Sequence, residues 1–98
     1  MQIQLHISRV PLSRQCVIYS WACRREAETI ASGTANAIEA CLVSAATIPA
    51  GHERESGKIE ILYRKVALGS FPVSDLDNCA ADVAKLIVER YQQTRTHA

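Results

Sequence analysis

Hydrophobic and polar residues alternate at the start of the chain. Ile3, Leu5 and Ile7 alternate with polar residues, which is the period-two pattern of a β-strand with one buried face. Pro11 ends this pattern, and a second alternating stretch follows over residues 15–24. Both faces of that second stretch are mostly apolar, so we expect it to be a central strand of the sheet.

A third strand is predicted directly after the second one. The charged cluster at residues 24–26 predicts a hairpin turn, after which residues 27–33 are expected to return along the second strand. Glu28, Ile30 and Ser32 would give this third strand a poor buried face.

The next pattern is helical. Asn36 and Glu39 have the spacing of a capping box, with Thr34 as a competing N-cap. They predict a helix over residues 35–48 that ends at residues 49–51, where a proline and a glycine occur. Its core stripe would consist of Ile38, Cys41, Leu42, Ala45 and Ile48.

The opposite side of this helix is nearly as apolar and consists of Ala40, Val43, Ser44 and Thr47. Glu39 is the only charge in the helix. Because a surface helix normally carries a polar face, we expect the second side to be covered by the rest of the fold or by a second copy of the chain.

A second strand-forming region follows a charged stretch. Residues 52–58 are predicted to form a solvated loop, and residues 59–68 are rich in strand-forming side chains. The hydrophobic phase shifts near Arg64 and Lys65, which indicates a bulge or a tight turn. Residues 69–72 then break the pattern.

The last element is the most periodic one. Ser74 and Asp77 have capping-box spacing and predict a helix over residues 75–94. Its core stripe would consist of Leu76, Ala80, Val83, Ile87 and Tyr91. Residues 96–98 are expected to fray.

The predicted order is β-β-(β)-α-β-(β)-α within a single domain of residues 1–98. The simplest packing is an α+β two-layer sandwich, in which a mostly antiparallel sheet of three to five strands carries two helices on one face. The other face would be solvated or covered by another molecule. Tyr19 and Trp21 share one face of the second strand, and we hypothesise that they form an interface if that face is the outer one.

Composition agrees with one globular domain. The 98 residues include 48% hydrophobic and 21% charged residues, which excludes the composition of a disordered chain. Eleven Lys and Arg against ten Asp and Glu give a net charge of +1, so any long-range electrostatic steering of a partner is weak. A domain of this size leaves little room for a large cofactor, and we expect none.

The compartment is predicted from the cysteines and the apolar runs. The first twenty residues contain no run of seven apolar residues, and no stretch approaches a membrane span, so we expect neither a secretory signal nor a membrane anchor. The cysteines lie in apolar segments without metal-ligand spacing and are Cys16, Cys23, Cys41 and Cys79. We expect buried, reduced thiols in the cytoplasm rather than a zinc site or a redox pair.

Candidates for catalysis are few. A nucleophile would need a neighbouring base, and His6, His52 and His97 lie on the polar side of a strand, in a charged loop and at the chain end. The glycines are isolated, so no phosphate-binding loop is present. We therefore predict no catalytic residue and no metal ligand.

One short motif has a counterpart in a known family. Thr34, Asn36 and Glu39 form the pattern Thr-x-Asn-x-x-Glu. This pattern resembles the start of the first helix in proteins of the ribonuclease H family. The resemblance implies three strands before this helix, and Asp75 in the place of an acid between a later strand and the second helix. That family's first strand carries a metal-binding Asp, whereas residues 2–8 contain no acid. Since a two-metal site needs several converging carboxylates, we interpret the motif as a helix cap.

Basic residues fall at predicted strand ends and turns, namely Arg9, Arg14, Arg24, Arg25, Arg64 and Lys65. A sheet edge could present them to a phosphate backbone, although acidic residues lie among them.

We predict a small cytoplasmic, non-catalytic binding or adaptor protein that acts as a homodimer through a protein–protein interface. The residues assigned to binding are Tyr19, Trp21, Arg24, Arg25, Arg64 and Lys65. The alternatives are a nucleic-acid-binding module and a degenerate ribonuclease H-like domain.

Overall fold

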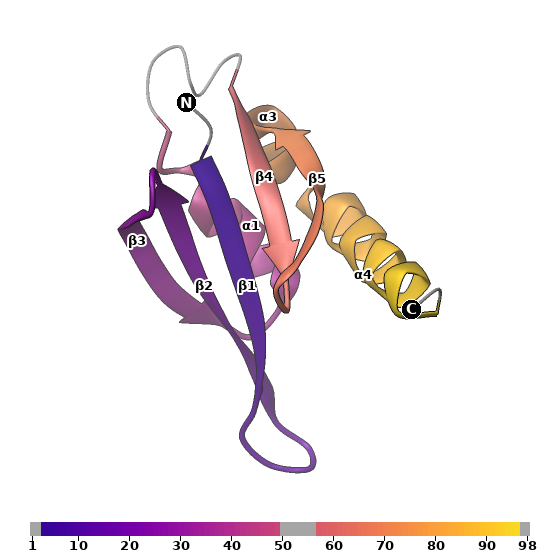
Figure 1. The fold of residues 1–98 in the computed structure, drawn as a ribbon. Helices are drawn as coiled ribbons and strands as arrows, with labels where there is room; N and C mark the ends of the chain where they lie inside the picture. The colour runs from indigo at the N-terminus through magenta and orange to yellow at the C-terminus, as the bar shows by residue number, and fades with distance from the viewer. Residues whose placement is uncertain (1–2, 50–56, 97–98) are drawn as a thin grey trace.

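The structure is a computed structural model that describes residues 3–49 and 57–96. Within these ranges the chain forms a five-stranded sheet with helices packed on one side (Figure 1). The elements in chain order are β1 (Ile3–Pro11), β2 (Val17–Arg25), β3 (Glu28–Ala35), α1 (Ile38–Ala46), β4 (Lys58–Tyr63), β5 (Val66–Pro72), α3 (Val73–Asn78) and α4 (Ala80–Thr96). The predicted α+β architecture is confirmed, and both optional strands are present.

The sheet is mixed but mostly antiparallel, with the order β3-β2-β1-β4-β5. β1 pairs antiparallel with β2 and parallel with β4, while β2–β3 and β4–β5 are antiparallel pairs. The parallel pair is possible because the chain returns through α1 before it forms β4. β2 is internal, as its two apolar faces predicted, but the central strand is β1.

The core lies between the sheet and the helices. The alternating residues Ile3, Leu5 and Ile7 are buried, and Leu5 pairs with Cys23 of β2 and with Ile61 of β4. The largest fully buried side chains are Leu5, Ile7, Leu42, Ile59, Ile61, Leu76 and Ile87. The sheet and the helices therefore share one contiguous hydrophobic core.

Both tight turns have a left-handed backbone. Glu26 and Ala27 join β2 to β3 with φ of 53° and 66°, and Arg64 and Lys65 join β4 to β5 with φ of 52° and 71°. Two-residue hairpin turns with positive φ at both positions match the twist of the strands they connect. The tight turn at Arg64 and Lys65 is confirmed, whereas the first turn lies later than predicted, because β2 continues through Arg25.

The predicted cap of the first helix is wrong. α1 begins after Ala37, which is extended with φ −147° and ψ 153° and has no side-chain capping hydrogen bond. The chain remains extended because Ala35 still pairs with Tyr19 in the sheet, so neither Thr34 nor Asn36 reaches the N-cap position. Pairing at the end of β3 thus overrides the local capping signal.

The core stripe of α1 is confirmed at Ile38, Cys41, Leu42 and Ala45. Its opposite side is not covered by the described part of the fold. Val43 on that side is 38% exposed. Over the described residues, the rest of the fold therefore does not cover this side at Val43.

The predicted C-terminal helix is divided into two. Cys79 interrupts it with φ −125° and ψ 33°, and its backbone N–H donates to the Asp75 carbonyl at 2.8 Å. The predicted cap is also wrong, because the N-cap of α3 is Pro72, without a side-chain hydrogen bond, while Ser74 and Asp77 lie inside the helix. Val83 starts the ladder of α4 by donating its N–H to the Cys79 carbonyl at 3.0 Å.

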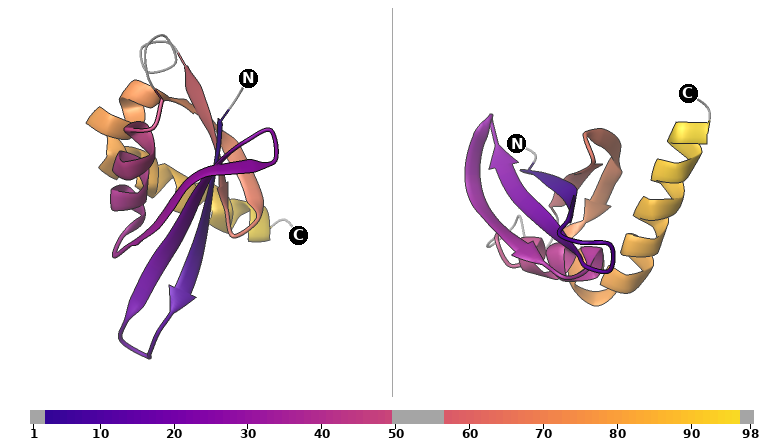
Figure 2. Two further views of the ribbon diagram at one scale, coloured as in Figure 1. Left: turned by 90° about the vertical axis from the view of Figure 1, so that its left-hand side faces the viewer. Right: turned by 90° about the horizontal axis from the view of Figure 1, so that it is seen from below.

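The β1–β2 hairpin extends beyond its neighbours. β4 pairs with β1 only over residues 3–7, and β3 pairs with β2 only from Tyr19 onward. Residues 10–18, which we call the hairpin arm, therefore have no neighbouring strand in the described structure and project from the sheet (Figure 2). With two residues of each strand and the tip of residues 12–16 beyond the neighbouring strands, the arm reaches roughly 10 Å beyond the sheet.

Some predictions fall outside the described ranges. Of the loop predicted at residues 52–58, residues 52–56 lie outside the described ranges, and Lys58 already begins β4. Of residues 96–98, which were predicted to fray, Thr96 is the last residue of α4, and residues 97 and 98 lie outside the described ranges. Among the described helices, none combines the length and the apolar character needed to cross a bilayer.

Candidate functional site

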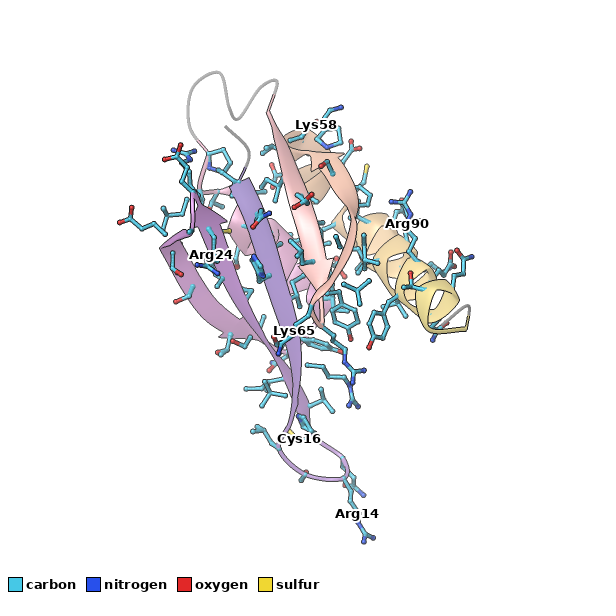
Figure 3. All side chains as sticks on the ribbon, viewed as in Figure 1. Arg14, Cys16, Arg24, Lys58, Lys65 and Arg90 are labelled. Carbon is cyan, nitrogen blue, oxygen red and sulfur yellow. The ribbon has the colours of Figure 1, made fainter. Side chains whose placement is uncertain are left out.

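The structure separates the basic residues that we assigned to binding. Arg24 and Arg25 end β2, whereas Arg64 and Lys65 follow β4. Because β2 runs antiparallel to β1 and β4 runs parallel to it, these two pairs lie at opposite ends of the sheet, as Arg24 and Lys65 show in Figure 3. The six residues therefore do not form one site.

Tyr19 and Trp21 lie on the inner face of the sheet. Both pack against the core cluster on the side that the helices cover. Trp21 pairs with Gly33 of β3, and its indole ring lies over that glycine, at 3.0 Å from the position that a Cβ would occupy. The interface hypothesised for an outward-facing Tyr19 and Trp21 is thus absent from the open face of the sheet.

Tyr19 nevertheless contributes to a surface groove of about 460 Å³ between α1 and α4. The groove is lined by Tyr19, Asn36, Ala37, Ile38, Glu39, Ala84, Lys85, Val88 and Glu89. It exists because α4 runs away from the short helix α1 along the β5 side of the sheet (Figure 2). The two helices contact each other at one end and leave apolar side chains between them.

The groove has an apolar floor and a polar rim. Ala84 and Val88 of α4 are half-buried and contact the core only in part. Glu39 of α1 and Glu89 of α4 contribute two carboxylates to the rim, against the single ammonium group of Lys85. The rim therefore carries a small excess of negative charge.

A second hollow continues the groove along α1. It is lined by Ala37, Glu39, Ala40, Val43 and Ser44 and shares Ala37 and Glu39 with the groove. Together, the groove and this α1 hollow form one apolar surface that includes the exposed Val43. The apolar second side of α1 is thus continuous with the groove.

Aromatic and basic side chains cluster beside the β4–β5 turn. The rings of Tyr63 and Tyr91 meet edge to face, with centroids 5.0 Å apart. The Arg64 guanidinium lies 5.3 Å from the centre of the Tyr91 ring, and its backbone N–H donates to the Ile7 carbonyl at 2.8 Å. Burial, and secondarily the nearby Tyr19, raises the pKa of the Tyr63 hydroxyl. Tyr19 therefore joins this cluster to the groove.

Arg90 attaches α4 to β5. Its Nη1 donates to the Leu68 carbonyl at 2.8 Å, and its guanidinium lies 5.4 Å from the centre of the Phe71 ring. Gly69 lies directly below, with φ 115°, and a Cβ there would come within 2.9 Å of the Arg90 Nη1. This contact holds the C-terminal half of α4 against the sheet edge, and thereby one wall of the groove.

The open face of the sheet carries polar contacts. The Gln4 Nε2 donates to the Glu60 Oε1 at 2.7 Å, and the His6 Nε2 lies 3.3 Å from the Gln4 Oε1. These contacts account for His6 as part of a surface hydrogen-bond network.

The carboxylates implied by the ribonuclease H resemblance are far apart in the fold. Glu39 lies at the end of the sheet where Ala35 pairs with Tyr19, whereas Asp75 follows β5 at the opposite end. Three strands precede α1, as the resemblance implies, but β5 intervenes before Asp75, which lies inside α3. Across residues 3–49 and 57–96, no three His, Cys, Asp or Glu side chains are grouped so that they could hold a metal ion.

The four cysteines are unpaired in the structure and divide into two classes. Cys23 and Cys41 are buried, and burial raises the pKa of both thiols from 9.0 to about 11. Cys16 and Cys79 are exposed, contrary to the prediction that all four are buried. The reason is their position, since Cys16 lies in the hairpin arm and Cys79 at the break between α3 and α4.

Comparisons of the chain with protein-family models, with curated proteins and with solved structures found no match.

Sequence reasoning missed the α4 side of the groove. Ala84 and Val88 each lie one position after a residue of the predicted core stripe, so they widen the apolar face of the helix. The width of this apolar face could have indicated a second contact surface on the helix, because a helix that packs on a single neighbour needs only a narrower apolar stripe. The position of α1 relative to α4, which makes the groove, depends on tertiary packing.

Proposed function

We propose that this chain is a small, cytoplasmic, non-catalytic binding protein that associates with another polypeptide through the groove between α1 and α4, and that it forms a homodimer. The observation that carries the proposal is the continuous apolar surface of the groove and the α1 hollow. Exposed apolar surface that is bordered by polar residues is a common feature of protein interaction sites.

The composition of the surface supports a protein partner. An apolar centre surrounded by polar groups is the usual anatomy of a protein–protein interface. Ala84, Val88 and Tyr19 provide the centre, and Glu39 and Lys85 provide part of the rim. Tyrosine is also among the residues enriched at the energetic centres of interfaces.

Charged substitutions on this surface test the proposal. We expect Val43→Glu and Val88→Glu to weaken self-association, measured as the molar mass in size-exclusion chromatography with light scattering over a range of concentrations. The matched control is Ile30→Glu, because Ile30 is 41% exposed on β3, close to the 38% of Val43, but lies outside the groove. Circular dichroism checks that each variant is folded. Association that is unchanged in both groove variants would contradict the proposal.

Nucleic-acid binding is a second candidate, favoured by one observation. The charged side chains of the hairpin arm and of the β4–β5 turn are all cationic, and no acid precedes Glu26 in the sequence. Arg14, Arg64 and Lys65 would provide phosphate contacts at this end of the sheet.

Fluorescence anisotropy with a labelled single-stranded RNA of about 20 nucleotides tests this candidate. Phosphate contacts would make the affinity fall steeply with salt, and Arg64→Gln with Lys65→Gln would reduce the slope. The same pair of substitutions at Arg24 and Arg25, at the opposite end of the sheet, is the control. If neither pair changes the slope, this surface does not bind RNA.

A further inference from the structure

The hairpin arm is an apolar projection without support from the rest of its own chain. Of its nine residues, five are apolar, namely Val10, Pro11, Leu12, Val17 and Ile18. Leu12 at the tip is 60% exposed, more than Ile30 and Val43, which are the other large hydrophobic residues exposed in the described structure. An isolated two-stranded hairpin is only marginally stable in water, so an arm of this kind gains stability from a surface that covers it.

The arm and the groove are complementary in charge. Arg14 lies at the tip and points away from the body of the molecule (Figure 3), and the arm contains no acidic residue. The groove rim contributes two carboxylates, those of Glu39 and Glu89, against one lysine. A cationic, apolar tip therefore matches an apolar groove with an acidic rim.

The arm does not occupy the groove of its own chain. In the described structure, none of residues 10–18 lines the groove, although Tyr19 at the base of the arm does. The arm extends away from the sheet and from both α1 and α4 (Figure 2). Its apolar side chains are consequently placed to reach a neighbouring molecule rather than α1 or α4 of the same chain.

We propose that the groove between α1 and α4 receives the hairpin arm of a second copy of this chain, and that the exchange is reciprocal. Leu12 occupies the apolar floor near Ala84 and Val88, and Arg14 faces the carboxylates of the rim. This inference rests on the proposed function, since it names the polypeptide that the groove binds.

A two-fold axis makes the exchange self-consistent. The arm and the groove adjoin at Tyr19 in each chain. A two-fold axis makes their contact reciprocal, because an arm that enters the groove of the second copy implies the converse contact. Each arm–groove contact is made twice, which doubles the area buried by a shallow groove. The assembly is complete with two copies, since both hairpin arms and both grooves are then covered.

Substitutions in the arm separate this arrangement from other dimers. We expect Leu12→Glu and Arg14→Glu each to raise the dimer dissociation constant, measured by sedimentation velocity, by about tenfold or more, as for an interface hot spot. Both side chains are exposed, and the tip is closed by backbone hydrogen bonds from the Leu12 and Ser13 N–H groups to the Cys16 carbonyl, at 2.9 and 3.1 Å. These substitutions therefore leave the fold intact, and Ile30→Glu is again the control.

A mixing experiment tests the exchange itself. The arm variant Leu12→Glu keeps an intact groove, and the groove variant Val88→Glu keeps an intact arm. Each is expected to be monomeric alone, whereas an equimolar mixture regains one intact arm–groove contact and forms a heterodimer weaker than the wild type. Ala84→Glu replaces Val88→Glu if the latter does not fold.

Each outcome distinguishes the inference from the proposed function. A wild-type dimer that is broken by Val88→Glu but not by Leu12→Glu overturns arm exchange and retains the groove as the interface, as in symmetric packing of α1 against α1. A dimer that is unaffected by both substitutions overturns both proposals, as does a wild-type chain that stays monomeric at high concentration. Two variants that remain monomeric when mixed also overturn arm exchange.

Discussion

At the scale of single residues, the two hairpin turns carry unfavourable backbone conformations. Ala27 has φ 66°, a region in which side chains with a Cβ are strained by about 1–2 kcal/mol. We expect Ala27→Gly to raise the free energy of unfolding by about 1 kcal/mol, measured by urea denaturation. Ala31→Gly, in the extended backbone of β3, is the control and should lower it by roughly 0.5–1 kcal/mol. A loss of stability in both variants would show that the turn is not strained.

The buried thiols give a second residue-scale prediction. Cys23 and Cys41 have a pKa of about 11 in the folded chain against 9.0 when exposed, so the unfolded chain loses their protons first. Stability is therefore expected to be unaffected by these groups below pH 9 and to fall as the pH rises from about 9 to about 11. Urea midpoints at several pH values measure this slope, which Cys23→Ala with Cys41→Ala should reduce. An equal slope in the wild type and in the variant with Cys23→Ala and Cys41→Ala would refute the assignment.

The same division applies to reactivity. Alkylation of the native protein is expected to modify the exposed Cys16 and Cys79 rapidly and the other two cysteines only after unfolding. Denatured, unreduced protein should then take up four adducts in total by intact mass. Two adducts or fewer would instead indicate a disulfide and reverse the prediction of a reducing compartment.

At the scale of elements, the anchoring of α4 depends on Arg90. Arg90→Lys keeps the charge but cannot keep the hydrogen bond to the Leu68 carbonyl and the contact with the Phe71 ring at the same time, because an ammonium group lacks the planar shape of a guanidinium. We expect the free energy of unfolding to fall by about 1 kcal/mol. Amide hydrogen exchange in the second half of α4 should accelerate. Lys85→Arg, on the groove side of the same helix, is the control, and unchanged exchange in Arg90→Lys would contradict the anchor.

The elements also show where sequence patterns succeed and where they fail. The alternation of Ile3, Leu5 and Ile7 predicted a buried strand face correctly, because burial on one face requires that period. The capping signal at Asn36 failed because strand pairing extends to Ala35, a tertiary effect that local spacing does not record. The side of the sheet that Trp21 occupies was undetermined, since both faces of β2 are apolar.

At the scale of the whole molecule, the candidate site arises from the arrangement of elements rather than from a motif. Only Tyr19 of the six residues assigned to binding lines the groove, because the other walls come from helices whose relative placement no local pattern encodes. The topology of the sheet also determines where the basic residues assigned to binding lie. Antiparallel pairing of β2 and parallel pairing of β4 with β1 place Arg24 and Arg64 at opposite ends of one sheet, although both lie at the C-terminal end of a strand.

The separation of the carboxylates leads to the last prediction, the absence of metal-dependent nuclease activity. Two divalent cations held about 3.5–4 Å apart repel each other, and nucleases of this kind offset the repulsion with several converging carboxylates. Here Glu39 belongs to the groove rim and Asp75 to α3 at the opposite end of the sheet, while β1 contains no acid. We therefore expect no cleavage of an RNA·DNA hybrid, of single-stranded RNA or of DNA with magnesium or manganese, assayed by gel electrophoresis of labelled substrates. Glu39→Gln serves as the specific control, because cleavage by the wild type that disappears in this folded variant would establish a ribonuclease H-like enzyme and displace the binding function.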